Sequence, residues 1–181
     1  MTRRDAIKRA AATALAPLTV PAAARALTLD ELKKLERAAV ARAVAAEQTA
    51  KVAFEAIANS GVLDARTTAT MRVLLDHAGL HADLMAQTFT SELGEDPPLP
   101  PRRTAIPGLE RLSTQPSALK LAEELELRAI AAHLAAVRQT HNAQLLKLIS
   151  GIVGSDGQNL VLLRQLLHQP PVPRAFERGL A

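Results

Sequence analysis

The sequence predicts an all-α protein, an antiparallel four-helix bundle with one long crossover. Four long stretches are rich in Ala, Leu, Val and Ile, and a proline-rich segment divides them into two pairs. No segment alternates apolar and polar residues as a half-buried strand does. The chain has no Trp, Tyr or Cys and only three Phe. Its core must therefore be aliphatic, which favours closely packed helices.

The first pair of helices has clear start and stop signals. We expect the first helix at 29–59, where Thr28 and Glu31 form a capping box that satisfies the free N–H groups of the first turn. The second helix is expected at 64–93, with Gly94 as its stop. A short turn between two long helices makes them antiparallel neighbours.

The second pair follows a connection at 95–116, where six prolines disfavour regular structure. We expect the third helix from about residue 117 to 140 and the fourth at 143–167, with a tail at 169–181. Two hairpins joined by one long crossover form a four-helix bundle of known connectivity. Residues 27–181 are of the usual size for one domain.

The first 26 residues are interpreted as an export signal. Arg3 and Arg4 open a basic segment, a weakly apolar run follows, and small residues offer cleavage sites near Ala24 and Ala26. These features predict a twin-arginine signal and a periplasmic or extracellular location. The alternative is an ordinary basic N-terminal arm. The apolar run is too short for a membrane-spanning helix, so any membrane contact would come from an uncleaved signal.

The charge balance excludes some classes of partner. Five of the 22 basic residues and one of the 18 acidic residues lie in the first 26, so the remainder is formally neutral. Without a basic surface or stacking aromatics, we expect no nucleic-acid binding. The absence of cysteine excludes disulfides and thiolate chemistry. Assembly into a homo-oligomer stays open.

Two carboxylates interrupt helical stretches that should be core. Glu47 and Glu126 lie midway along Ala-rich apolar helices in the two halves of the chain, and each is followed seven residues later by a ring, Phe54 and His133. A buried carboxylate is costly unless it is paired or bound to a metal. The matching positions predict a duplicated hairpin around a shared polar centre.

This pattern resembles the ferritin-like di-metal carboxylate proteins. That family places one Glu on the first and third helices and a Glu-x-x-His pair on the second and fourth. Glu47 and Glu126 match the single glutamates, His81 matches the His of the second-helix pair, and Asp156 matches the carboxylate of the fourth-helix pair. The resemblance implies a ferritin-like bundle with Glu47, His81, Glu126 and Asp156 as metal ligands.

Two of the six positions depart from the family pattern. Ala78 stands where the second-helix carboxylate belongs, and Asn159 stands where the fourth-helix His belongs. The reduced set could hold one divalent metal, iron or else Mn or Zn, or two poorly. Asp76 should face away from the site, whereas His77, one turn from His81, could share its face. The segment 171–179 also resembles the ends of exported ferritin-like proteins.

The sequence leaves other interpretations of these residues open. Either glutamate could lie on a solvated edge, and His133 is better explained as a core residue hydrogen-bonded to a carboxylate than as a ligand. Gly151, Gly154 and Gly157 surround Asp156 and could mark a kink or a close approach to a neighbouring helix.

Three functions therefore compete. The first is an exported metal-binding ferritin-like protein, with weak metal oxidase activity at most. The second is a metal-free ferritin-like bundle with a structural, stress-related or partner-binding role, and it is favoured by the two lost ligands and the absence of tyrosine. The third is a helical interaction module whose polar centre is accidental. No residue pattern predicts another enzyme class.

Overall fold

The computed structural model describes residues 27–173. The predicted export signal and the end of the chain from Arg174 lie outside the described residues, so what the sequence indicates for these two segments stays a prediction. The described elements are four α-helices and two single-turn 3₁₀ helices: α2 (Leu29–Ala58), α3 (Ala65–Leu93), η1 (Arg103–Ala105), η2 (Leu109–Arg111), α4 (Gln115–Gln139) and α5 (Ala143–Leu166). The predicted all-α class is confirmed for these residues.

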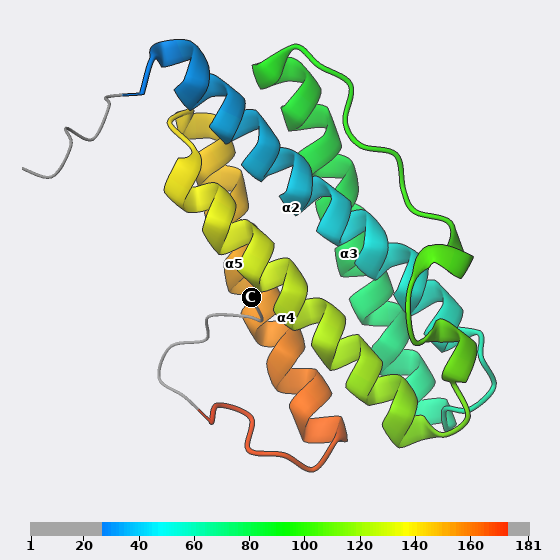
Figure 1. The fold of residues 1–181 in the computed structure, drawn as a ribbon. Coiled ribbons are helices and arrows are strands. Elements are labelled where there is room, and N and C mark those ends of the chain that lie inside the picture. Colours follow the sequence, from blue (N-terminus) through cyan, green and yellow to red (C-terminus); the bar gives the residue numbers. More distant parts are fainter. Residues whose placement is uncertain (1–26, 174–181) are drawn as a thin grey trace, which may run out of the picture.

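The helices form a square bundle in which every neighbouring pair is antiparallel (Figure 1). α2 packs against α3 and α4, and α5 also packs against α3 and α4. α2 and α5 therefore lie on one diagonal of the square, and α3 and α4 lie on the other. Of the four neighbouring pairs, α3 and α5 are the least closely packed.

Side-chain caps fix the helix ends close to where the sequence predicts them. The Thr28 side chain accepts a hydrogen bond from the backbone N–H of Glu31, and the Glu31 carboxylate accepts one from that of Thr28. The Asp64 carboxylate accepts the N–H of Thr67 at 2.7 Å and begins α3. Gly94 ends α3 with φ 69°, a left-handed conformation that glycine adopts without steric cost.

The third helix begins two residues earlier than predicted. Thr114 caps α4, so Pro116 belongs to the first turn and not to the crossover. Proline is tolerated there because N–H groups of the first turn have no partner within the helix. At the start of α5, the Asn142 side chain accepts the backbone N–H groups of Gln144 and Leu145.

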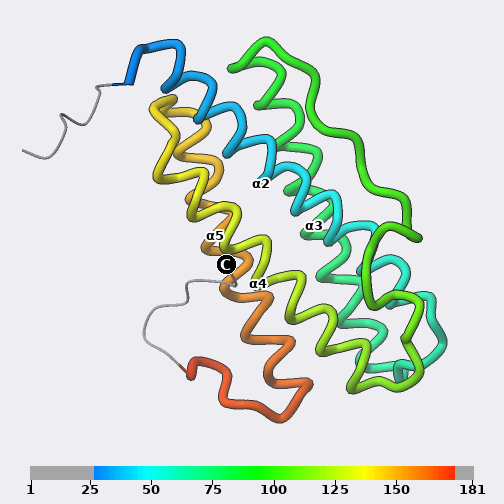
Figure 2. The backbone as a smooth tube through the Cα atoms, viewed as in Figure 1, coloured from blue at the N-terminus to red at the C-terminus, as the bar shows by residue number. Residues whose placement is uncertain are grey.

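The crossover returns along the length of the bundle, as the tube in Figure 2 shows. Its two 3₁₀ turns are the only regular structure found in this described connection. Ile106 and Leu109 are buried against the helices. The Gln48 side-chain amide on α2 donates a hydrogen bond to the carbonyl of Pro98 at 2.6 Å. The crossover is thus part of the core of the domain.

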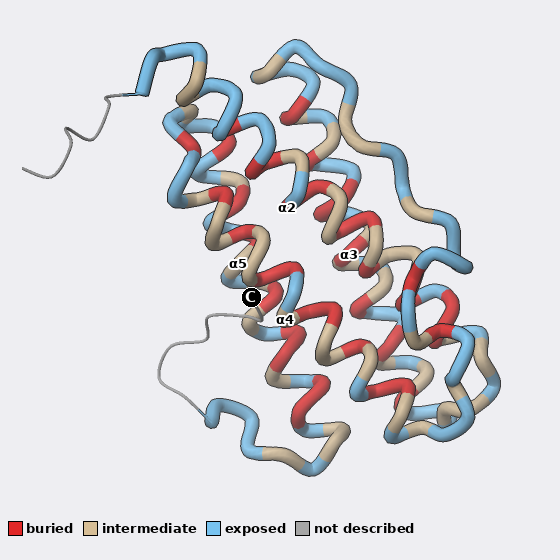
Figure 3. Tube along the Cα trace, viewed as in Figure 1, coloured by how far each residue is buried: buried red, intermediate tan, exposed pale blue. Residues whose placement is uncertain are grey.

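The buried positions line the inner faces of the helices (Figure 3) and form two separate apolar clusters. The crossover-side cluster includes Phe54, Met71, Leu74, Leu119 and Leu163. The far cluster includes Val40, Met85, Phe89, Leu145 and Ile149. On each helix, the residues between these two clusters supply the polar centre described below. Within the described residues, no helix is long and apolar enough to cross a membrane.

Candidate metal centre

A layer of buried polar side chains separates the two apolar clusters. Each helix contributes to it: Glu47 from α2, His81 from α3, Glu126 and His133 from α4, and Asp156 and Asn159 from α5. All six are buried. Burial of so many polar groups is costly unless each finds a partner, and the layer is therefore the candidate functional site.

Four of these residues form a ring in which carboxylates and imidazoles alternate. His81 Nδ1 lies 3.5 Å from Glu47 Oε1 and 3.3 Å from Asp156 Oδ1. His133 Nε2 lies 3.4 Å from Glu47 Oε1, and His133 Nδ1 lies 2.9 Å from Asp156 Oδ2. Glu47 and Asp156 come from diagonal helices, so the two imidazoles connect carboxylates whose helices are not neighbours.

The ring leaves several donor and acceptor atoms without a hydrogen-bond partner. Among the described residues, the buried atoms of this centre without one are Glu47 Oε1, His81 Nδ1, Glu126 Oε1 and His133 Nε2. Only the His133–Asp156 contact in the ring is a hydrogen bond. Buried unpaired polar atoms are rare in native proteins and point to a missing partner such as an ion.

The carboxyl groups of Glu126 and Glu47 are both harder to ionise than usual. Burial raises the pKa of Glu126 well above its ordinary value, and the charges of Asp156 and Glu47 raise it further. Burial also raises the pKa of Glu47, although the close contact with His81 works in the opposite direction. Without a cation, Glu126 therefore keeps its proton to a higher pH than an ordinary glutamate does.

The pKa values of Asp156 and His81 shift so that this pair is charged. Burial would raise the pKa of Asp156, but its contacts with His133 and His81 outweigh that effect and lower it. Burial would lower the pKa of His81, but Asp156 and Glu47 together raise it to about 10. An imidazolium at His81 is thus one way to balance the charge of the centre.

A second polar level lies one turn toward the crossover-side cluster. Half-buried His77 donates from Nδ1 to Asn159 Oδ1 at 2.8 Å. Hydrogen bonding from the Asn159 side chain in turn lowers the pKa of Glu126, against the larger effect of burial. His77 therefore orients Asn159 toward Glu126. The His77 and His81 rings are stacked with centroids 6.4 Å apart.

The predicted ligands are brought together unequally. Glu47, His81 and Asp156 each offer a donor atom within 4.8 Å of the other two, and all three are buried. Glu126 is buried in the same layer but lies outside this triad. The assignment of these four residues as metal ligands stays a prediction. The suggestion that the two glutamates lie on a solvated edge is wrong, because both are buried.

Two contacts of the polar centre were not predicted from the sequence, one made by His133 and one made by His77. His133 is fully buried and bonds Asp156, as expected for a core histidine, but its second contact with Glu47 was not predicted. Its position two helical turns after Glu126, on the same face of α4, was the available signal. Asp76 is exposed, as expected. The His77–Asn159 bond was missed because the pairing of α3 with α5 has no local signature.

The positions that depart from the six-ligand pattern have other structural roles. Ala78 packs into the crossover-side cluster, and Asn159 is engaged by His77. Gly151, Gly154 and Gly157 do not mark a close approach, because a Cβ atom at each would meet nothing within 4 Å. That expectation is wrong, and α5 runs uninterrupted through these glycines.

Comparisons with known proteins agree with this arrangement. The model of the ferritin-like domain family matches residues 24–169. A crystal structure of the conserved hypothetical protein Rv2844 from Mycobacterium tuberculosis has a similar fold, with a TM-score of 0.68 and 18% sequence identity over 80% of this chain and 99% of that chain. No curated protein matches. The chain belongs to the ferritin-like domain family.

Proposed function

We propose that the protein binds one divalent transition-metal ion in the polar centre, through Glu47, His81 and Asp156. The observation that carries this proposal is the convergence of these three buried side chains, each of which offers a donor atom within 4.8 Å of the other two. Two of these atoms, Glu47 Oε1 and His81 Nδ1, have no hydrogen-bond partner. A cation would give these lone pairs the partner that the protein does not supply.

The donor set fits such an ion. Carboxylate oxygens and imidazole nitrogens without thiolates suit Fe²⁺, Mn²⁺ or Zn²⁺. Within the proposed ligand set, His81 Nδ1 lies 3.5 Å from Glu47 Oε1 and 3.3 Å from Asp156 Oδ1. A tetrahedral cation with bonds of about 2.0–2.2 Å spaces its ligands roughly 3.3–3.6 Å apart. Both distances from His81 therefore match the edge of a single coordination site, and the third pair, Glu47 and Asp156, lies within 4.8 Å.

One ion is favoured over two. A second ion of the ferritin-like pattern would require a carboxylate at position 78 and a histidine at position 159. Ala78 is apolar and buried, and the Asn159 amide is already engaged by His77. Glu126 supplies one further carboxylate to the centre, but no complete second ligand set accompanies it.

His133 has the contacts of a supporting residue. Its Nδ1–H donates to Asp156 Oδ2 at 2.9 Å, which leaves Asp156 Oδ1 facing His81. Outer-shell hydrogen bonds of this kind fix the orientation of metal-binding carboxylates and their mutation typically weakens metal binding by about 10–100-fold. We expect the same range for His133→Phe, which places in α4 the ring that Phe54 provides in α2.

A metal-free structural centre is the second candidate function. The observation in its favour is the pKa of His81, raised to about 10 by Asp156 and Glu47 after burial is overcome. A protonated His81 would balance part of the carboxylate charge without an ion. The two candidates differ in one measurable respect, because a metal that binds His81 must displace the proton that His81 holds.

Calorimetry with Fe²⁺, Mn²⁺ and Zn²⁺ tests the proposal. We expect saturable binding and net proton release, read from the dependence of the binding heat on the ionisation enthalpy of the buffer. Asp156→Asn should weaken binding, whereas the same change at exposed Asp76 should not. Absence of binding by all three metals would favour the metal-free bundle. Slow Fe²⁺ oxidation by the loaded protein would extend the proposal to weak oxidase activity.

We also propose export through the twin-arginine route, on the strength of the Arg3–Arg4 pair and the small residues that follow it. That route carries folded proteins, some already loaded with a cofactor, so it suits a protein with a buried metal. Replacing both arginines with lysine should leave precursor in the cytoplasm. Mature protein outside the membrane from the double variant would contradict the assignment.

A further inference from the structure

The polar centre is not equally closed on all sides. His81 is 7% exposed, whereas Glu47, Glu126, Asp156 and His133 are 3% exposed or less. His81 lies on α3, beside the least closely packed interface of the bundle, that with α5. The side of the centre nearest to solvent is therefore the α3–α5 side.

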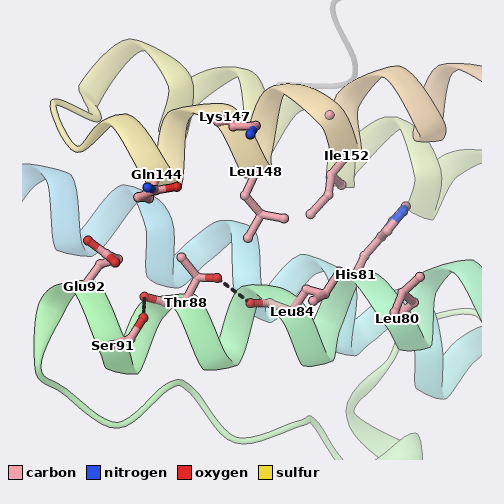
Figure 4. A pocket seen from close by; sticks show the side chains of 11 residues that line it. Leu80, His81, Leu84, Thr88, Ser91, Glu92, Gln144, Lys147, Leu148 and Ile152 are labelled. Atoms are coloured by element: carbon pink, nitrogen blue, oxygen red, sulfur yellow. Dashed lines mark hydrogen bonds between the residues drawn. The ribbon is translucent and has the colours of Figure 1, made fainter.

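A groove between α3 and α5 ends at His81 (Figure 4). Its volume is about 560 Å³, within the range of small-molecule sites. His81 lies toward one end of this α3–α5 groove, and Glu92 lies at the other end, eleven residues along α3. One helical rise of 1.5 Å per residue makes this distance roughly 16 Å.

The walls beside His81 are apolar. Leu80 and Leu84 on α3 are 58% and 38% exposed, and they face Leu148 and Ile152 of α5 across the groove. Besides His81, the charged residues that line the groove are Lys147, beside Leu148 on α5, and Glu92, at the end of the groove away from His81, and their charges are opposite. With His81 bound to the metal as a neutral imidazole, the α3–α5 groove thus offers no net charge to a molecule that approaches it.

Gly151 has no side chain and so leaves space open on the α5 side of the groove. It lines the groove, and a Cβ atom added there would meet nothing within 4 Å. A Cβ atom added at Gly154, one turn further along α5, would also meet nothing within 4 Å, but Gly154 does not line the groove. The two glycines therefore form a matched pair, because a side chain can be added at either without a clash and only one addition fills the groove.

We infer that the α3–α5 groove is the binding and entry site for small, neutral, largely apolar molecules that reach the metal centre at His81, and that Gly151 sets the size admitted. This inference rests on the proposed function for its metal, but the groove and its chemistry are properties of the described residues alone. The inference explains why Leu80 and Leu84 are exposed beside a buried polar centre: they contact the molecule that binds in the groove.

Two chelators test the inference on the full chain loaded with Co²⁺, whose visible absorption reports the bound metal. The neutral, flat 1,10-phenanthroline should remove Co²⁺ at a rate proportional to its concentration. The highly anionic EDTA should remove it at a rate independent of EDTA concentration, set by spontaneous release. Gly151→Leu should lower the phenanthroline rate constant at least about tenfold, equivalent to roughly 1.4 kcal/mol in the barrier, and Gly154→Leu should leave it within about twofold.

A second measurement needs no metal. Phenanthroline should shift the methyl NMR signals of Leu84, Leu148 and Ile152 in the metal-free protein, and Gly151→Leu should abolish these shifts while circular dichroism confirms the fold. Equal sensitivity of the two glycine variants, or phenanthroline and EDTA rates with the same concentration dependence, would overturn the inference. Methyl shifts without any Co²⁺ binding would overturn the metal proposal and leave the groove assignment standing.

Discussion

The apolar clusters and the polar centre lie at the same depth in one bundle, but they differ in whether their buried groups find partners within the protein. The clusters are complete by themselves, since side chains such as Phe54 and Leu163 are fully buried against apolar neighbours. The centre is equally buried, but it holds polar atoms with no partner in the protein. The comparison teaches that the bundle is stabilised by its two ends, whereas its middle is organised for something the chain alone does not provide.

The largest expected effect lies in the clusters. Phe54→Ala removes a fully buried ring from the crossover-side cluster and should lower the free energy of unfolding by about 3–5 kcal/mol. Urea denaturation measures it, with Val73→Ala on the exposed face of α3 as the control. A loss below about 1 kcal/mol would contradict the assignment of stability to the ends of the bundle.

The next largest effect is the stability that the protein gains when a metal ion binds the polar centre. Because an ion that binds only the folded chain stabilises it by mass action, a metal at 100 times its dissociation constant should add about 2.7 kcal/mol. Thermal unfolding with and without Fe²⁺, Mn²⁺ or Zn²⁺ measures this gain. Glu47→Gln should remove most of it. An undiminished gain in that variant would place the ion elsewhere.

A smaller effect of opposite sign is expected at Glu126. Burial raises the pKa of this carboxyl group, and one of its oxygens has no partner. Glu126→Leu replaces it with an apolar side chain of similar size, which should stabilise the metal-free protein by about 1–2 kcal/mol and reduce the gain from metal. Destabilisation of the metal-free protein would contradict this expectation and show that the hydrogen bond from Asn159 outweighs the cost of burying Glu126.

The last expected effect is a pH dependence of the metal-free protein, spread over several pH units. The pKa of His81 is raised to about 10, so its contribution to stability is present below its ordinary value of 6.5 and is lost as the pH rises toward 10. The raised pKa of Glu126 acts in the same direction, because the folded chain binds a proton that the unfolded chain has released. Urea midpoints should fall from pH 6.5 to 10, and a steady rise would contradict these shifts.

Sequence predicted the ends of the bundle better than its middle. Helix ends depend on local signals such as the Thr28 capping box and Gly94, so their positions could be expected within about two residues. The polar layer could be located too, because Glu47 and Glu126 each stand out locally as a carboxylate within an apolar helical stretch. The bridging of Glu47 to Asp156 by His133 could not be predicted, because it depends on which helices are diagonal in the folded bundle.

The groove was also beyond sequence reasoning. Gly151 and Gly154 cannot be told apart in the sequence, because both lie in a glycine-rich part of the fourth helix. Their difference arises only when α3 is placed beside α5 and one of the two glycines lines the space between them. Residues that act across an interface carry no periodic signal along their own helix.

The most direct test of the central claim is the number of metal ions bound per chain, measured by elemental analysis of protein equilibrated with Fe²⁺, Mn²⁺ or Zn²⁺ and freed of excess ion. We predict one ion in the wild type, none retained by the Asp156→Asn variant, and two in the Ala78→Glu, Asn159→His double variant, which restores the six-ligand pattern. No ion in the wild type, or one ion retained by Asp156→Asn, would contradict the proposed centre.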